Sequence, residues 1–526
     1  MVAVIPNNSS VIFQTLIYVL NQSIVQDESS YNYYYMKIGK ETNAKKCYGI
    51  YGCFELSPPW TSEHRPVSLF PDDLDEIDPN YFLYTRKNRM KPSVIDVNEF
   101  EYVENSDIEP EKPIFVVTHG YMEGGSIDWI YNTAQALLDA EDSNVIVIDW
   151  HGGSSPPYTQ AVANIRLIGS MTAHLLYDIA AYTGDIGLEH VHCIGHSLGA
   201  HLCGYVGYTL QDQFNLSLGR ISGLDPAEPH FAKAARPVRL DRSAAKYVDI
   251  IHTDASQFIR GSLGMTESIG HVDYFPNGGT NQPGCGKSMV QFIKDEKGSF
   301  FNGMKKYLAC NHVRAHQVFL DSINPKCSYL SVACTSIQDF IDGKCWDCGE
   351  YGERCIKFGF YGQKHYNKFY GNGMNFSLNQ YLITGGEKPF CRGHYRIMVK
   401  VSGSLDSKTH AGEIGQLMFT MHSTTDGSGF KTAPAGFVSG YYEPGGIYMK
   451  VVATDEVMDL KAVEVEWRFN SSLFNPLTWR FLSKPKIFLT KIIVWGLENQ
   501  QSLTVCPKNQ QALINGQSQL MIPTYC

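Results

Sequence analysis

One short pattern in the sequence, Gly195-His196-Ser197-Leu198-Gly199, has the residue types needed for nucleophilic catalysis. A GxSxG pattern arises by chance with a probability of roughly 0.3 in a chain this rich in glycine, so its surroundings must decide. The residues before it, HVHCI, are typical of a strand, and those after it, LGAHLCGYVGYTL, are typical of a helix. In a nucleophile elbow, small residues let the turn between strand and helix close without a clash. We therefore predict that Ser197 projects from such a turn at a helix N-terminus, where amide dipoles favour developing negative charge.

A serine in this position needs a base and an orienting acid. The hydroxyl is a weak nucleophile unless a histidine takes its proton, and a carboxylate holds that histidine in place. On this type of scaffold the acid and then the histidine follow the serine. Asp225 ends the next predicted strand, where active-site residues of parallel sheets gather, although it also fits a turn aspartate before Pro226. Among 17 histidines, spacing alone leaves two or three candidates for the base, with His312 and His316 foremost.

The elements that must position these residues form an α/β pattern. Between about residues 110 and 255, short apolar runs alternate with segments of helical periodicity, which is typical of parallel strands covered on both faces. The sequence therefore predicts an α/β domain with a mostly parallel central sheet. Its predicted strands are 114–118, 145–149, 191–194, 221–223 and 247–252, and its predicted helices are 159–182 and 198–210.

The pattern changes after about residue 390, where extended runs are separated by Gly-rich or polar turns. Sustained helical periodicity is absent from this part of the sequence, which indicates an antiparallel β-sandwich with a boundary near 385–392. The predicted strands are 394–401, 414–421, 446–453, 462–469 and 485–495.

Length and composition are consistent with two globular domains. The chain has 526 residues, of which 43% are hydrophobic and 18% are charged, so it can bury sizeable cores. Its net charge of −9 gives no general attraction to nucleic acids or anionic membranes, because both require clustered positive charge. The brief basic stretch Arg86, Lys87, Arg89 is best interpreted as a solvated turn.

The fourteen cysteines favour disulfides over a metal centre. A zinc site usually needs two CxxC motifs or a CxxC followed by spaced histidines, and Cys345 with Cys348 forms the only CxxC. Disulfides would place the protein in an oxidising compartment, and several N-glycosylation sequons agree with secretion. Short spacings predict four pairs: Cys47–Cys53, Cys334–Cys345, Cys348–Cys355 and Cys506–Cys526.

The N-terminal segment has some features of a signal peptide. No Lys or Arg precedes Lys37, and Gln14 and Thr15 interrupt the apolar run 11–20. This run is too short for a membrane span, which needs about 20 apolar residues. We therefore expect residues 1–25 to contain a weak signal peptide and the mature protein to be secreted.

Eight motifs resemble those of the animal pancreatic lipase family, and they occur in the same order along the chain. The likeness extends from about Cys47 to Cys526. The motifs are VTHGY (117–121), IDWHGG (148–153), YTQAVANIR (158–166), VHCIGHSLGAH (191–201), GLDPAEP (223–229), IHTD (251–254), GHVDYFPNGG (270–279) and CNH (310–312).

The resemblance implies an α/β-hydrolase domain over residues 26–390 and a β-sandwich lipid-interface domain over 391–526. It assigns Ser197 as the nucleophile, Asp225 as the acid and His312 as the base. It also implies an oxyanion hole formed by the backbone N–H groups of Tyr121 and Leu198, which agrees with the general requirement for donors beside the nucleophile.

The function implied by this resemblance is a secreted lipase that hydrolyses carboxylic ester bonds of acylglycerols. Its partner is a lipid interface, and a colipase-like protein is a candidate second partner; we expect a monomer that binds no nucleic acid. Two alternatives are a phospholipase that removes the first acyl chain and a catalytically silent lipid-binding relative. A carboxylesterase for small soluble esters would not need the C-terminal sandwich.

The resemblance also implies a calcium site in the segment 236–244. The carbonyl groups of Arg236 and Arg239 and the carboxylate of Asp241 match its ligands, but Ala244 replaces a second carboxylate. Calcium prefers several oxygen ligands with sufficient negative charge. We therefore expect that no cofactor is required.

The segment between Cys285 and Cys310 corresponds to the lid of the family, and we infer a disulfide between these two cysteines. Apolar residues at helical spacing, including Phe292, Phe300 and Phe301, predict two short amphipathic helices on either side of Gly298. Phospholipid-selective members of the family usually have a shortened lid, so the resemblance implies triacylglycerol as the substrate, with activation at an interface.

Four cysteines remain after these assignments. Cys193 and Cys203 flank the elbow, and we expect them to be buried free thiols. Cys327 and Cys391 are left to pair with each other by parity.

Overall fold

A computed structural model describes residues 45–62, 65–99, 101–184, 188–256, 262–295, 300–371, 377–470, 484–508 and 511–526. The expected signal peptide, residues 1–25, lies outside them. The chain forms two compact units. The first comprises the described residues up to Asn324 together with Gly359–Asn379, and the second comprises Pro325–Phe358 and Gln380–Cys526. The second unit thus includes segments that the sequence alone placed before the boundary near 385–392.

The central strands of the first unit are parallel and buried, as predicted. Their apolar runs leave no exposed face, because every residue of β5, β6, β7 and β8 is buried. Hydrogen-bonded pairs β6–β5, β5–β7, β7–β8 and β8–β9 are all parallel. The strands span Ile114–Thr118 (β5), Asn144–Asp149 (β6), Val191–His196 (β7), Leu218–Leu224 (β8) and Ala245–Ile251 (β9).

Shorter strands extend this sheet on both sides. On one side, β10 (Val272–Pro276) continues the parallel arrangement next to β9. On the other side, β3 (Asn80–Tyr84) runs antiparallel to β6, and β4 (Ser93–Ile95) runs antiparallel to β3. A separate hairpin is formed by β1 (Lys45–Cys47) and β2 (Cys53–Glu55).

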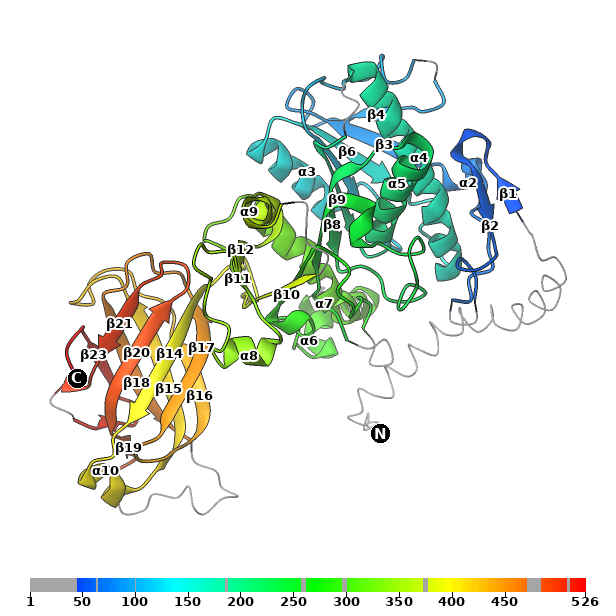
Figure 1. Ribbon diagram of the computed structural model, residues 1–526. Coiled ribbons are helices and arrows are strands. Elements are labelled where there is room, and N and C mark those ends of the chain that lie inside the picture. Colours follow the sequence, from blue (N-terminus) through cyan, green and yellow to red (C-terminus); the bar gives the residue numbers. More distant parts are fainter. Residues whose placement is uncertain are drawn as a thin grey trace, which may run out of the picture. The chain divides into compact units, whose positions relative to one another are not determined.

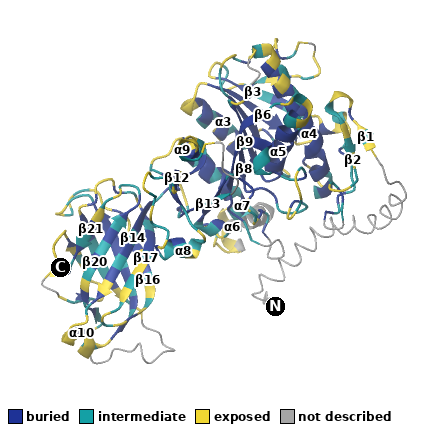
Figure 2. Ribbon diagram, viewed as in Figure 1, coloured by how far each residue is buried: buried dark blue, intermediate teal, exposed yellow. Residues whose placement is uncertain are grey.

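Helices cover both sides of these strands. In Figure 1, α4 (Tyr158–Thr183) and α5 (Leu198–Phe214) lie on one side and α3 (Asp128–Ala140) lies on the other. Helix α5 packs on β7, β8 and α4, while α3 packs on β6 and on α7 (Phe300–Ile323). The strands β8 and β9 are buried, and the exposed residues gather in loops and on the outer helix faces (Figure 2). The first unit also contains α2 (Leu74–Ile77), α6 (Met289–Asp295), α9 (Gly362–Phe369) and the 3-10 turns η1 (Gly49–Tyr51), η2 (Arg242–Ala244), η4 (Asn277–Gly279) and η5 (Gly359–Tyr361).

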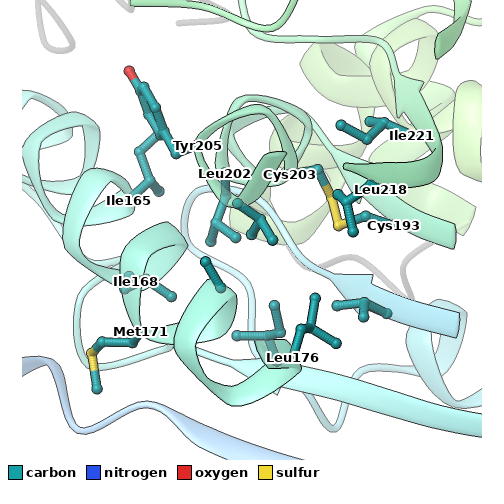
Figure 3. Packing of buried hydrophobic residues seen from close by; sticks show 14 of the residues in the cluster. Ile165, Ile168, Met171, Leu176, Cys193, Leu202, Cys203, Tyr205, Leu218 and Ile221 are labelled. Atoms are coloured by element: carbon teal, nitrogen blue, oxygen red, sulfur yellow. A yellow bond between two sulfur atoms is a disulfide. The ribbon is translucent and has the colours of Figure 1, made fainter. Parts of the chain in front are cut away.

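The packing of α5 on β7 includes a disulfide that was not predicted from the sequence. Cys193 and Cys203 are fully buried, as expected, but they are bonded to each other rather than free. Figure 3 shows the bond near Leu218, in the core that α4 and α5 share with the strands. The strand and the helix pack closely enough on each other to bring the two α-carbons to 5.8 Å, within the range of a disulfide.

The second unit is built mainly from two four-stranded antiparallel sheets, as predicted. Inward-facing apolar residues alternate with more exposed ones, for example along β15, and the inward side chains form one core. One sheet has the order β17 (Ile447–Thr454), β14 (Gly393–Val401), β20 (Leu489–Gly496), β21 (Ser502–Val505), and the other has the order β16 (Ala435–Tyr442), β15 (Glu413–His422), β18 (Ala462–Phe469), β23 (Ser518–Met521).

Smaller elements complete the second unit. The hairpin of β11 (Leu330–Ala333) and β12 (Cys355–Lys357) pairs with Gln380 and Tyr381 of β13 (Leu378–Leu382). The remaining elements are β19 (Lys486–Ile487), β22 (Leu513–Ile514), α8 (Ile337–Ile341) and α10 (Leu405–His410).

All the other inferred disulfides are present. The four short-range pairs and Cys285–Cys310 are confirmed, and Cys327 is bonded to Cys391. The last bond ties residue 327 to the start of the sandwich, which agrees with the inclusion of 325–358 in the second unit. No helix among the described residues is both long and apolar enough to cross a membrane.

The bond between Cys193 and Cys203 gives a first prediction. Its loop spans 10 residues, so replacing both cysteines with alanine should lower the free energy of unfolding by about 2–3 kcal/mol. Urea denaturation of the purified protein measures this change, with Cys506→Ala/Cys526→Ala as a control in the other unit. Detection of free thiols at Cys193 and Cys203 in the native protein would contradict the bond.

Candidate active site

The turn between β7 and α5 places Ser197 in a strained backbone conformation. Its φ of 57° and ψ of −118° are rarely adopted by residues with a side chain. Glycine is required on both sides because the turn is so closely packed. A Cβ atom on Gly195 would lie 2.2 Å from the carbonyl oxygen of Gly199, and one on Gly199 would lie 2.6 Å from that of His119. The predicted strand–turn–helix is therefore present, with Ser197 immediately before the first residue of α5.

Asp225 follows the last residue of β8, as predicted from the sequence. The carboxylate is fully buried, and its Oδ1 accepts hydrogen bonds from the backbone N–H groups of Thr253 (2.8 Å) and Asp254 (3.1 Å). These donors belong to the IHTD segment, which begins at the last residue of β9. A buried charge is tolerated only when such donors compensate for the lost water. Asp225 is thus held in a fixed orientation by the end of the neighbouring strand.

His312 is the histidine that contacts this acid. Its Nδ1 lies 2.6 Å from Oδ2 of Asp225, and its ring centroid lies 4.6 Å from that of His196, the residue before Ser197. His312 lies within α7, two positions after Cys310. With Nδ1 engaged by Asp225, Nε2 is the nitrogen left to exchange a proton with a neighbouring group.

The structure places the rival histidine, His316, in a different environment. Its ring stacks on that of Trp129 at 4.7 Å, and burial lowers the pKa of His316 well below its ordinary value. Its Nδ1 has no hydrogen-bond partner among the described residues. Only one of the two candidates therefore has the acid that a general base requires.

The two residues expected to form the oxyanion hole belong to segments that lie next to Ser197. Leu198 is the first residue of α5. Tyr121 follows Gly120, and a Cβ atom on Gly120 would lie only 2.9 Å from Cβ of Ser197. The turn that carries Tyr121 is therefore in van der Waals contact with the serine. Backbone N–H groups in such positions can stabilise a negative oxygen that develops on a substrate held at Ser197.

A second carboxylate, that of Asp254, lies beside this group and was not assigned a role from the sequence. One oxygen of Asp254, one oxygen of Asp225 and one ring nitrogen of His312 all lie within 4.8 Å of one another. Asp254 is buried and accepts a hydrogen bond from the N–H of Leu263 at 2.9 Å. Burial, together with the charge of Asp225, raises the pKa of Asp254 from 3.8 to about 7. The sequence signal was the IHTD motif itself, which contains an acid at the end of a predicted strand.

The residues that the resemblance implies for calcium do not fit this ion well. The Oδ1 atom of Asp241 accepts from the N–H (3.1 Å) and the hydroxyl (2.8 Å) of Ser243. Its Oδ2 lies 3.8 Å from the guanidinium of Arg239, whose carbonyl oxygen accepts from the hydroxyl of Tyr208. Asp241 is the only acidic side chain in the segment 236–244, and it already faces a cation.

The segment expected to form a lid contains a short helix and the start of a second, but the second helix, α7, is long and not short as predicted. Helix α6 comprises Met289–Asp295, and α7 begins at Phe300 and continues past Cys310. The side chains of Phe292, Phe300 and Phe301, and the break at Gly298, lie outside the described part of the chain. The disulfide Cys285–Cys310 joins the two ends of the segment.

Taken together, these groups have the chemistry of acyl transfer. Ser197 lies on a strained elbow, His312 is oriented by Asp225, and the turn that carries Tyr121 packs against the serine. Such an arrangement can form and then hydrolyse an acyl-serine ester without a metal ion.

Comparison with known proteins places this geometry in context. A family model described as Lipase matches residues 44–390. A pancreatic triacylglycerol lipase of Myocastor coypus is 33% identical over 444 residues, which cover 84% of this chain and 91% of that protein. An inactive pancreatic lipase-related protein 1 of Mus musculus is 32% identical over a match that covers 89% of this chain and 93% of that protein. A pancreatic lipase-related protein 2 of Rattus norvegicus is 36% identical over a match that covers 70% of this chain and 75% of that protein.

The raised pKa of Asp254 predicts a pH-dependent effect on stability. Between about pH 4 and 7 the folded protein keeps a proton that the unfolded chain has released, so this group makes folding less favourable as the pH rises through that range. Asp254→Asn cannot ionise, and its side-chain oxygen can still accept from Leu263. We expect the variant to be more stable than the wild type by about 1–2 kcal/mol at pH 8 and no more stable at pH 4.

Chemical denaturation at the two pH values tests this prediction. Asp212→Asn removes an exposed carboxylate from α5 and serves as the control, with no expected change at either pH. A stabilisation by Asp254→Asn that is equal at pH 4 and pH 8 would show that ionisation of Asp254 is not its cause.

Proposed function

We propose, from the premise that this chain belongs to the pancreatic lipase family, that it is a secreted triacylglycerol lipase whose catalytic residues are Ser197, Asp225 and His312. The observation that carries the proposal is the 2.6 Å contact between His312 Nδ1 and Asp225 Oδ2 beside a strained serine elbow. The family supports ester hydrolysis of lipids in general, and the relatives named triacylglycerol lipases support this substrate class.

In the proposed first half-reaction, Ser197 Oγ attacks the carbonyl carbon of the ester while His312 Nε2 takes the hydroxyl proton. Asp225 stabilises the imidazolium that forms, because its negative charge faces Nδ1 at hydrogen-bond distance. The backbone N–H groups of Tyr121 and Leu198 donate to the negative oxygen of the tetrahedral intermediate. The intermediate collapses when the bond between the carbonyl carbon and the alcohol oxygen breaks, and His312 gives its proton to the oxygen of the leaving alcohol.

The second half-reaction releases the acid. His312 takes a proton from water, the resulting hydroxide attacks the acyl-serine, and the same backbone groups stabilise the second negative oxygen. Collapse breaks the bond to Ser197 Oγ, which recovers the proton from His312. The net reaction converts one ester bond and one water molecule into an alcohol and a carboxylic acid.

Secretion and the interface are parts of the same proposal. Seven disulfides among the described residues support an oxidising compartment, where such bonds persist. The helices α6 and α7 in the segment closed by Cys285–Cys310 support a lid that opens at a lipid surface. The protein is proposed to act as a monomer at this surface, with a colipase-like protein as a candidate partner.

A catalytically silent role is the competing function, because some relatives are named inactive. The contact between His312 and Asp225 favours an active enzyme, since a silent protein has no need for an acid–base pair beside a strained serine.

The first functional prediction is that Ser197→Ala abolishes ester hydrolysis without unfolding the protein. The hydroxyl forms the covalent bond to the acyl group, and losing a member of such a triad typically lowers the rate by several orders of magnitude. Hydrolysis of a short p-nitrophenyl ester measures the loss, and circular dichroism confirms the fold. A variant that retains more than a few per cent of the wild-type activity would rule out Ser197 as the nucleophile.

The second functional prediction concerns the substrate. We expect emulsified triacylglycerol to be hydrolysed faster than phosphatidylcholine, and the rate per molecule of a short triacylglycerol to rise when its concentration exceeds its solubility. Deletion of residues 289–307, with both cysteines kept, should remove this rise. A preference for phosphatidylcholine would favour the phospholipase alternative, and equal rates above and below the solubility limit would contradict a lid that responds to an interface.

A further inference from the structure

A second carboxylate–imidazole pair, formed by Glu123 and His196, lies next to the proposed triad. Glu123 is in the turn after β5, and His196 is the last residue of β7, directly before Ser197. Oε2 of Glu123 lies 3.5 Å from Nδ1 of His196, and Nε2 of His196 lies 3.3 Å from the carbonyl oxygen of His312. Both ring nitrogens of His196 therefore face oxygen atoms. Through His196, these contacts connect the turn after β5, the elbow and the backbone of His312.

Glu123 also holds the backbone of its own turn. Its Oε2 accepts a hydrogen bond from the N–H of Gly120 at 2.9 Å. The carbonyl oxygen of Glu123 accepts from the hydroxyl of Ser154 at 3.0 Å, and the N–H of Met122 donates to the carbonyl oxygen of Ser154 at 2.9 Å. The turn is thus fixed at Gly120, Met122 and Glu123, the residues on both sides of Tyr121.

Charge contributes to this arrangement. Burial disfavours ionisation of Glu123, whose side chain is 17% exposed, but the hydrogen bond and charge of His196 and the N–H of Gly120 outweigh it. Together they hold the pKa of Glu123 well below its ordinary range. The carboxylate is therefore charged at neutral pH, and a charged acceptor binds an N–H group more strongly than a neutral one.

The position of this pair relative to Ser197 gives it a consequence for catalysis. Gly120 packs directly on Ser197, and the peptide bond after Gly120 carries the N–H group of Tyr121. A donor in an oxyanion hole acts only when it is fixed close to the place where the negative oxygen develops. Rotation of the Gly120 backbone would turn the Tyr121 amide away from that place, and the bond to Glu123 resists this rotation.

We propose that Glu123 and His196 are positioning residues, which hold the amide of Tyr121 and the backbone of His312 in fixed positions relative to Ser197. This inference rests on the proposed function, because it presupposes that Ser197 and His312 carry out ester hydrolysis. Neither residue needs to touch the substrate. Their effect is expected in the chemical step and not in the binding of the ester.

The test compares two substitutions at Glu123 in the full-length protein. Glu123→Ala removes the acceptor for the Gly120 N–H and the partner of His196, whereas Glu123→Gln keeps a neutral acceptor of nearly the same shape. Loss of a single oxyanion donor typically lowers kcat by roughly 10²–10³-fold. We expect Glu123→Ala to lower kcat on a soluble p-nitrophenyl ester about 100-fold and to leave KM within about twofold of the wild-type value. The kcat of Glu123→Gln should be about tenfold higher than that of Glu123→Ala, or more.

A matched control comes from the second unit. His422 Nε2 lies 3.3 Å from Oε2 of Glu464, so Glu464→Gln disturbs a similar pair that is not part of the proposed site. This variant should keep the wild-type kcat and KM. The rate at which a fluorophosphonate labels Ser197 should fall in parallel with kcat in Glu123→Ala, because labelling uses the same oxyanion hole. Thermal unfolding checks that each variant is folded.

The outcomes separate this inference from the proposed function. If the wild type is active and Ser197→Ala is not, but folded Glu123→Ala and Glu123→Gln both keep the wild-type kcat, the positioning role is wrong and the proposed function stands. A folded Glu123→Ala protein in which KM rises and kcat is unchanged also overturns it. A fall in kcat at constant KM, with partial recovery in Glu123→Gln, supports it. If wild-type and Ser197→Ala proteins behave alike, the proposed function itself fails.

Discussion

The buried carboxylate of Asp225 is the constraint on which the candidate site depends. A fully buried charge is unfavourable unless hydrogen-bond donors replace the water that it has lost, and Asp225 obtains its donors from two other places in the chain. The backbone N–H groups of Thr253 and Asp254 come from the end of β9, and the ring of His312 comes from α7. The neighbouring parallel strands β8 and β9 must therefore end at the same level, and α7 must pass close to the carboxyl ends of these strands. The same geometry brings His312 next to the elbow.

Much of this arrangement follows from patterns that are local in the sequence. Continuous apolar runs identified the five central strands, because a strand buried on both faces has no polar side to present. The elbow was identified for a similar reason, since close approach of the backbone leaves only glycine at positions 195 and 199. The strand Ala435–Tyr442 was missed, because its sequence, AGFVSGYY, contains two glycines that weaken a strand signal.

Features that depend on contacts between distant parts of the chain could not be read in this way. The choice between His312 and His316 required the position of Asp225, 87 residues before His312, and the pairing of Cys193 with Cys203 required the packing of α5 on β7. Glu123 carried no pattern that distinguished it from a surface acid, and Asp254 was marked only by its place in the IHTD motif after a predicted strand. Their environments are created only when the turn after β5 and the segment after β9 meet the elbow.

The disulfide between Cys193 and Cys203 has a topological consequence for the elbow that carries Ser197. It closes a covalent ring that begins in β7, passes through the turn with Ser197 and returns through the first turns of α5. A protease that cut any peptide bond inside this ring would leave the two fragments joined, with strand and helix still connected through sulfur. After any single cut inside the ring, Ser197 therefore stays covalently connected to both β7 and α5. In a compartment that contains proteases, a nicked molecule of this kind would keep both arms of its elbow.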